Sequence, residues 1–600
     1  MKRAAVIFLP WWLSLSGAGS AEAQEGFDMQ QLAEQQARQD RNVLDDAKEL
    51  LAADNHAEAA LAAHLGRDLK DIDQQEESIY VLGKALYRLE LYHSALQQFA
   101  EILEKGPDSR FFDAALEWCL FISRKLVDDA SVNEVIAKYG SRDFPENYRD
   151  EFLFRLARYH YLEALRRDGG PAVAAGQRDK EGLSIEGNIF GTGGDRAPAK
   201  VEKRRGGGLS IGGDLFGTAS EEPEAESEEG VSLGGEGALS ASAHLVEAEK
   251  LSLRVSDGSR FGPRARFLTA LVQFKNGREN DALGSFKEVV RTTGERDDRG
   301  SRKLRELAFF QLARTHFGAQ QPSFATFYYD RIDRDSTEWL DALFEDSWAH
   351  FRLGNYEKAL GNLLTLHSPF FEDAYFPESL ILKAVIYYEN CRYAEAEKIL
   401  EDFLSRYEPV LEELGRITSQ PRSATEYFDL LEGIRNPDLA SQVQAEAATL
   451  EKILGLAMAD PQLARLDASQ GEVKAELARL REEHPLLAGT PLADTLTRTL
   501  ARKRADLVGK AGAAIERRLV REQEHIKELV QQAVRIGIET ARSEQERIES
   551  KLRRVQTQPK SIEKTFVRWT DDEKIVWPFE GEYWRDELGT YELTLARSCR

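Results

Sequence analysis

The chain has few cysteines and only one long apolar run, and both features limit what it can be. Three cysteines occur in 600 residues, too few and odd in number for the disulfide framework that holds small exported domains together. Cys119 and Cys391 fall within expected helices and are predicted to be small buried hydrophobic residues, with a disulfide bridge as the less favoured alternative. Cys599, beside the chain end, is expected to be exposed. After residue 15, no segment has the roughly 18 uninterrupted apolar residues that span a membrane.

Motifs of known catalytic chemistry are also missing. The sequence contains no His-Glu-x-x-His motif, no Gly-x-Ser-x-Gly motif and no paired-cysteine zinc spacing. His160, His316 and His350 share one place in a repeated pattern, where packing between helices accounts for them. The net charge of −23 argues against nucleic acid and disfavours adhesion to anionic lipid. We therefore expect no enzymatic activity, no cofactor and no metal site.

The first residues have the pattern of a cleaved secretory signal peptide. Lys2 and Arg3 precede the apolar run Ala4–Leu15, and the small residues of Ala21-Glu22-Ala23 fit a cleavage site before Gln24. The run is too short for a membrane anchor, and no cysteine near the site indicates a lipoprotein. We expect a mature chain in the bacterial periplasm, with association with an outer-membrane or envelope complex left open. A eukaryotic secretory context also fits.

A pattern of large and small residues recurs in six segments. Each segment has two large residues seven positions apart, which places both on one face of a helix, and a small residue four positions before the second. The large pairs are Tyr80/Tyr87, Phe154/Tyr161, Phe267/Phe274, Phe310/Phe317, Phe344/Phe351 and Ile381/Tyr388. The small residues are Gly83, Ala157, Ala270, Ala313, Ser347 and Ala384, and most are followed twelve positions later by an alanine: Ala95, Ala282, Ala325, Ala359 and Ala396.

This pattern resembles the tetratricopeptide repeat (TPR), a pair of antiparallel helices of about 34 residues that stacks into a superhelix. The resemblance is best in Ile79–Pro107, and it implies an all-α solenoid of roughly five to seven repeats over Asp45–Pro409. In that family the first helix of each pair lines the concave surface. The aromatic pairs are therefore candidates for a groove that binds a peptide, including the chain's own tail. The alternative is that they are core between neighbouring repeats.

A narrower resemblance suggests a setting for such a solenoid. The segments Phe344–Ala359, Ser368–Phe371, Pro377–Tyr393 and Trp577–Trp584 look like parts of periplasmic TPR proteins of myxobacteria, including components of adventurous gliding motility. This resemblance implies a scaffold between inner-membrane and outer-membrane components. We expect an exported, non-enzymatic adaptor that binds protein or peptide partners. The alternatives are a structural oligomer built through the long C-terminal helix and an accessory module of a peptidoglycan-processing enzyme.

The repeats are expected to occupy residues 24–167 and 239–435, after the signal peptide of residues 1–23. Between them, residues 168–238 are rich in glycine and acidic residues and lack apolar periodicity, so we predict a disordered insertion. Two copies of a short phrase in this insertion either dock on a sheet edge or in a groove, or are a duplication without function. Their apolar residues are Leu183, Ile185, Ile189, Phe190, Leu209, Ile211, Leu215 and Phe216.

The C-terminal part is expected to be a helical region, residues 436–560, followed by an aromatic-rich segment, residues 561–600. Apolar residues over Pro491–Val555 recur every three, four and seven positions, which predicts a long amphipathic helix. From Ile526 onward the period is nearer 3.6 than 3.5, so a strict heptad seam is not evident. Packing on the chain's own helices and self-association both stay open.

The aromatic-rich segment is too short for a core of its own, so its aromatic residues are expected to dock on another part of the chain. The alternative is a carbohydrate-binding surface.

The signal-peptide prediction can be tested by mass. Because Ala21 and Ala23 suit the peptidase site, the protein recovered from periplasm should begin at Gln24. Intact mass spectrometry of the exported protein checks this. A chain that keeps Met1 and stays in the membrane fraction would contradict export.

Overall fold

A computed structural model of the chain describes most of the expected helical regions. The described residues are 43–126, 133, 136–138, 144–168, 240–294, 296, 298–371, 374–435, 461–555, 575–576 and 578–595. The signal peptide, the insertion with its duplicated phrase, Trp577 and Cys599 lie outside them, so the expectations for these residues stay predictions. Within the described ranges, no helix combines the length and the hydropathy that crossing a membrane requires.

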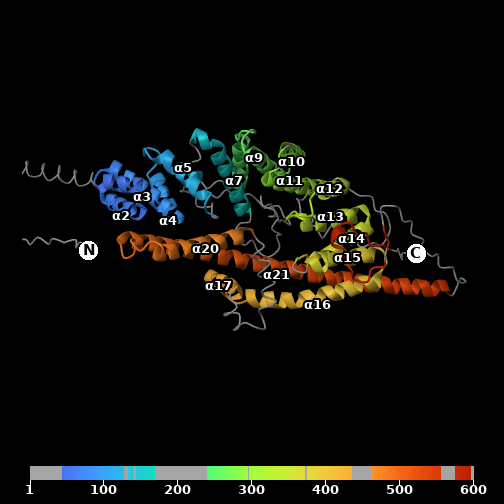
Figure 1. Cartoon of the computed structure of the whole chain (residues 1–600). Coiled ribbons are helices and arrows are strands. Elements are labelled where there is room, and N and C mark those ends of the chain that lie inside the picture. Colours follow the sequence, from blue (N-terminus) through green and yellow to red (C-terminus); the bar gives the residue numbers. More distant parts are fainter. Residues whose placement is uncertain are drawn as a thin grey trace, which may run out of the picture. The chain divides into compact units, whose positions relative to one another are not determined.

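The chain forms two compact units, and each contains residues from both halves of the sequence (Figure 1). The first unit comprises residues 1–127 and 471–504, and the second comprises residues 128–470 and 505–600. Helices account for nearly all of the regular structure in the described part of the chain. The prediction of an all-α fold with a long C-terminal helix, α21 (Pro491–Val555), is confirmed.

Six helix pairs have the TPR-like arrangement, the first in the first unit and the other five in the second. They are α3 (Ile72–Arg88) with α4 (Tyr92–Glu104), α7 (Arg149–Asp168) with α8 (Ala241–Leu253), α9 (Gly262–Lys275) with α10 (Glu279–Gly294), α11 (Arg299–Gly318) with α12 (Pro322–Tyr329), α13 (Trp339–Leu353) with α14 (Tyr356–Leu366), and α15 (Pro377–Glu389) with α16 (Tyr393–Thr418). Each of the six large pairs found in the sequence lies on the first helix of its hairpin.

The small residues of the pattern lie where the two helices of a hairpin approach each other. Gly83, Ser347 and the alanines of the pattern are buried. At Gly83 of α3, an added Cβ would lie 2.8 Å from the ring of Phe99 on α4. Close packing therefore leaves no room for a larger side chain at this place. The large residues fill the space on either side.

One backbone conformation recurs in the turns between the paired helices. Gly277 and Gly354 have φ of 70° and 75°, and Glu90, Gln320 and Cys391 have φ of 58–59° at the corresponding places. A left-handed residue ends the first helix and reverses the chain. Glycine adopts this conformation without strain, whereas the other three residues do so at a cost.

The two cysteines within the described residues differ in their bonding. Cys119 is a buried free thiol on α5 (Phe112–Ser123), as predicted. Cys391 is only partly buried and is disulfide-bonded, so the expectation of a small buried hydrophobic residue is wrong for it. Its place in the turn between α15 and α16 explains its partial exposure, and the odd cysteine count concealed the bond.

In the first unit, a C-terminal helix docks on an N-terminal hairpin. The unit contains α2 (His56–Leu65), α3, α4 and α5 together with the end of α20 (Pro461–Glu482). The carboxylate of Glu476 accepts hydrogen bonds from the backbone nitrogens of His93 and Ser94, at 2.8 and 2.9 Å, and from the Ser94 hydroxyl at 2.7 Å. It thereby satisfies free N–H groups in the first turn of α4, where a negative charge is favoured. Arg479 and His484 bond to backbone oxygens of the α3–α4 turn.

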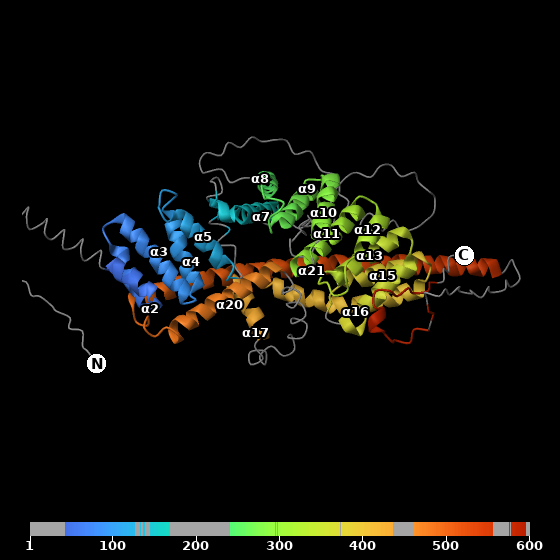
Figure 2. The same cartoon turned by 45° about the horizontal axis from the view of Figure 1, so that its top comes forward.

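In the second unit, α21 lies along α15 and α16 (Figures 1 and 2). Ile526, Leu529, Ala533 and Ile536 of α21 pack against a cluster that includes Leu380, Ile381, Ala384 and Val385 of α15 and Leu400 and Phe403 of α16. Further along, Ala511, Ile515 and Leu519 pack against residues of α16 and of α17 (Ala424–Arg435). Of the two possibilities for this helix, packing on the chain's own helices is therefore observed.

A partly buried polar group joins α21 to α15. The ring of His525 lies 2.9 Å from Glu378 of α15 and 3.5 Å from Glu522 of α21. Tyr375 donates a hydrogen bond to Glu522 at 2.5 Å. Burial alone would lower the pKa of His525, but the hydrogen bonds and charges of the two carboxylates raise it to about 10. The imidazolium therefore bridges two carboxylates in a partly buried place.

The packing of α17 on α21 generates a prediction with an internal control. A Cβ at Gly512 would overlap the carbonyl oxygen of Ala424, whereas one at Gly509 on the same helix would meet nothing. Gly512→Ala should destabilise the protein by about 1–3 kcal/mol because the backbones must separate. Gly509→Ala should stabilise it by about 0.5–1 kcal/mol through helix propensity. Urea unfolding of both variants measures the difference, and equal effects would contradict the contact.

The His525 group generates a prediction about pH. His525 binds its proton more tightly in the folded state, so its stabilising effect is complete below its ordinary pKa of 6.5 and is lost as pH rises towards 10. The urea midpoint should therefore fall over this range. In the His525→Gln variant the fall should be smaller, because glutamine does not titrate. Parallel pH profiles of the two proteins would refute the assignment.

Candidate peptide-binding site

The structure places the predicted groove residues in two environments. Phe154, Tyr161, Phe267, Phe310, Phe344 and Tyr388 are buried, whereas Tyr80, Tyr87, Phe274, Phe317 and Phe351 are partly buried. Several contact other aromatic rings within the repeats, such as Tyr80 with Phe99 and Phe111. Burial of this kind is typical of core between neighbouring helices. Binding of a separate partner by these residues stays a prediction.

Two of these residues meet α21. Phe351 packs at the edge of the cluster formed by α15, α16 and α21. The hydroxyls of Tyr388 and Ser543 of α21 are 3.2 Å apart. On this side of α15, the surface of the repeats is therefore occupied by a segment of the same chain.

A second segment of the chain lies on α14. Figure 1 shows the C-terminal segment, in red, beside α14, and four hydrogen bonds hold it there. Gly589 donates its N–H to the Thr365 hydroxyl at 2.9 Å and accepts a hydrogen bond from Lys358 Nζ at 2.8 Å. The N–H groups of Leu593 and Leu595 donate to the backbone oxygen and a carboxylate oxygen of Glu357, at 2.9 and 3.1 Å. All four bonds use the backbone of the tail.

The tail contacts α14 most closely at a glycine, Gly361. A Cβ at Gly361 would overlap the carbonyl oxygen of Tyr591, so the tail touches the helix where a side chain is missing. Tyr591 is buried, and its hydroxyl both accepts from Trp584 N–H and donates to Trp584 C=O, at 2.8 and 3.0 Å. The expectation that the tail docks on another part of the chain is confirmed at Tyr591, although Trp584 and Phe579 stay exposed.

Sequence reasoning missed the residues that hold the tail. Glu357 and Lys358 are adjacent on α14, and Gly361 and Thr365 follow about one and two turns later. A lysine and a glutamate near a helix start are too common to stand out. The signal present in the sequence is Gly361, because a glycine in a helix interior costs stability and calls for a packing reason.

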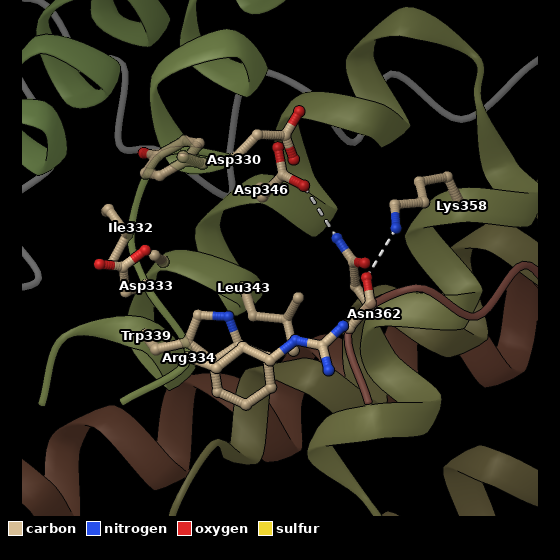
Figure 3. A pocket seen from close by; sticks show the side chains of 12 residues that line it. Asp330, Ile332, Asp333, Arg334, Trp339, Leu343, Asp346, Lys358 and Asn362 are labelled. Carbon is tan, nitrogen blue, oxygen red and sulfur yellow. Dashed lines mark hydrogen bonds between the residues drawn. The ribbon is translucent and has the colours of Figure 1, made fainter. Parts of the chain in front are cut away.

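A cavity of about 270 Å³ opens beside the docked tail. It lies between the α12–α13 connection, α13, α14 and Gly589 of the tail, and Figure 3 shows Trp339, Arg334 and Lys358 around it. Three carboxylates, from Asp330, Asp333 and Asp346, also line it. Arg334 donates a hydrogen bond to the backbone oxygen of Asp586 in the tail. The tail therefore forms part of the wall.

The cavity wall contains buried hydrogen-bond acceptors. Asp346 is 3% exposed and accepts from Asn362 Nδ2 at 2.9 Å, as the dashed line in Figure 3 shows, while His350 Nε2 lies 3.2 Å from the same carboxylate. The Oδ1 atoms of Asp346 and Asn362 accept no hydrogen bond from the described residues. Burial and the charge of Asp346 raise the pKa of Asp330. The carboxylates of Asp330 and Asp333 belong to exposed residues that line the cavity, and they can accept hydrogen bonds from a donor group that enters it.

The histidines of the repeated slot make contacts within the repeats. His160 Nδ1 lies 2.8 Å from His244 Nδ1 on the paired helix, and burial followed by the charge of His244 lowers the pKa of His160. His316 Nδ1 lies 2.8 Å from Gln321 Oε1. In the part of the chain that the structure describes, no group of three or more His, Cys, Asp or Glu residues is arranged to hold a metal ion.

Comparisons with known proteins find distant similarity in structure only. No family model matches the chain, and no curated protein sequence matches it. Among solved structures, it is similar to a Rap protein complexed with competence and sporulation factor, to the Cut9–Hcn1 heterotetramer of APC/C and to yeast Tom70. Each alignment covers 78% of this chain and 99%, 84% and 97% of the others, at 10%, 10% and 12% identity and TM-scores of 0.25, 0.22 and 0.18. All three are TPR-like helical-repeat proteins, but TM-scores this low carry no argument about function.

Proposed function

We propose that this chain is a non-enzymatic TPR-like adaptor of the bacterial cell envelope, which binds extended segments of protein partners on the surface of its repeats. The observation that carries the proposal is the docked tail: α14 already binds a segment of the chain through its backbone, at the turn that contains Gly589 and at Leu593 and Leu595. Four hydrogen bonds and the close approach at Gly361 hold the backbone of the tail. A site of this kind accepts other extended segments that offer a similar backbone path.

The side chains of the tail supply a second level of selection. Leu593 and Leu595 pack against the hydrophobic core around α13 and α14, so an apolar residue at alternate positions favours docking. The cavity next to Gly589 is lined by the carboxylates of the exposed residues Asp330 and Asp333. A partner segment that brings a hydrogen-bond donor into this cavity gains over one that does not.

The envelope setting rests on features of the sequence. The signal-peptide pattern before Gln24 supports export, and the resemblance of Phe344–Ala359 and Pro377–Tyr393 to myxobacterial periplasmic TPR proteins supports a scaffold role, including one in gliding motility. The tail is then an internal occupant of the site, which a partner segment displaces.

Peptide binding in trans tests the proposal. In full-length protein, the double change Tyr591→Ala and Leu593→Ala should release the tail and leave the surface of α14 intact. A fluorescent peptide of residues 584–595 should then bind this variant and bind the unchanged protein weakly, because the chain's own tail competes at high effective concentration. Fluorescence anisotropy measures both affinities.

A matched pair of glycine substitutions controls for the site. Added to the released-tail variant, Gly361→Ala should abolish peptide binding, because the new Cβ occupies the place of a backbone carbonyl. Gly284→Ala, also within a helix but in open space, should leave binding unchanged. Binding that survives Gly361→Ala, or that is absent from the released-tail variant, would refute the site. Hydrolysis of peptidoglycan by the purified chain would refute the non-enzymatic role.

A further inference from the structure

The C-terminal part of α21 carries an apolar stripe that stays exposed. Val534, Ile538, Ile548 and Leu552 expose 45%, 64%, 49% and 59% of their surface. The face of α21 that packs on the repeats is formed by other residues, among them Ala533 and Ile536. Figures 1 and 2 both show the end of α21 extending past α15 and α16.

The stripe has the spacing of a coiled-coil seam. From Val534, positions 538, 541, 545, 548 and 552 follow at alternating intervals of four and three, and all six side chains are exposed. In heptad notation, Val534, Ala541 and Ile548 occupy d positions, and Ile538, Gln545 and Leu552 occupy a positions. The sequence concealed this seam because Ala541 and Gln545 are not large apolar residues. The buried face, with its period near 3.6, also overlaps it along the chain.

We propose that this stretch of α21 pairs with the same stretch of a second copy of the chain, as an antiparallel coiled coil centred between Gln545 and Ile548. In this register Leu552 packs against Ala541 of the second copy, and Gln545 packs against Ile548 of the second copy. Twofold symmetry repeats each contact. In this register the paired stretch runs from Ala541 to Leu552 and is about 17 Å long, and Val534 and Ile538 lie beyond it.

The charged residues beside the seam are complementary to those of a second copy of α21, and they favour an antiparallel arrangement of the two helices. The flanking e positions hold Arg542 and Glu549, and the flanking g positions hold Glu544 and Lys551. In the antiparallel register, Arg542 lies opposite Glu549 of the second copy and Glu544 lies opposite Lys551 of the second copy, each pair occurring twice. A parallel pair in register would place Glu544 opposite Glu549 twice, and like charges there are unfavourable.

The charged groups are available for these pairs. Within one chain, Arg542 lies 3.4 Å from Glu546, and Arg553 lies 3.4 Å from Glu549, and all four side chains are exposed. Exposed pairs of this type contribute little to stability, so exchanging them costs little.

Two features set the strength of the interaction. The helix already exists, because α15 and α16 hold its buried face, so association avoids most of the entropy cost of ordering a helix. Gln545 inside the seam lowers affinity but fixes the register. We therefore expect a reversible dimer whose population rises with protein concentration. This inference is independent of peptide binding on α14.

Sedimentation velocity of the full mature chain over a concentration series tests the dimer. The unchanged protein should shift from monomer to dimer, and the double variant Ile548→Glu with Leu552→Glu should stay monomeric at every concentration. Because both residues are exposed, its melting temperature should match that of the unchanged monomer. A monomer at every concentration for the unchanged protein, or a dimer that survives the double variant, would overturn the proposal.

Charge reversal tests the orientation. Glu549→Lys should weaken the dimer roughly tenfold, because it places two pairs of like charges opposite each other. Combining it with Arg542→Glu should restore the affinity, since the swapped charges again oppose each other only in the antiparallel register. Glu546→Lys, the same charge change outside the seam, should have no effect. Tighter association of Glu549→Lys would indicate a parallel pair and overturn the assignment.

Discussion

The solenoid depends on covering the apolar side of its repeats. The last hairpin, α15 with α16, carries apolar side chains such as Leu380, Ile381 and Val385 that pack against α21. Exposed surface of this kind favours association with other molecules. Here a single long helix from the same chain covers it, so the second unit owes much of its core to α21 and the binding surface on α14 is held on a stabilised frame.

The two units meet this need with different chemistry. In the second, α21 contributes leucine and isoleucine side chains and the bridging imidazolium of His525. In the first, α20 contributes a carboxylate to the start of α4, where three hydrogen bonds from His93 and Ser94 converge on Glu476. Burial raises the pKa of Glu476 even so. The contact between α20 and α4 therefore depends on the hydrogen bonds that Glu476 accepts at the start of α4, although its carboxylate is removed from water.

The repeats could be predicted from the sequence because close packing dictates side-chain size at fixed spacing. Residue 83 must be small because the large side chain of Phe99 lies against it. The two residues are close in the sequence, so the pattern of small and large residues is visible within one helix pair. The docking of C-terminal segments could not be predicted in this way. His525 meets Glu378 across 147 positions. Leu595 meets Glu357 across 238 positions. Nothing periodic in the sequence links either pair. Charged residues are also common enough in this chain that no single pair stands out.

Because α21 lies near the C-terminal end of the sequence, it is synthesised after the repeats against which it packs. The repeats are synthesised first, yet Glu378 and Leu380 of α15 acquire their partners only when residues beyond 520 have been made. Contacts across such separations form slowly, because a long loop must close before they contribute. Until then the nascent solenoid displays an uncovered apolar flank, which is the condition under which partly folded chains aggregate. Completion of the C-terminal third is thus the step that commits the molecule to its native state.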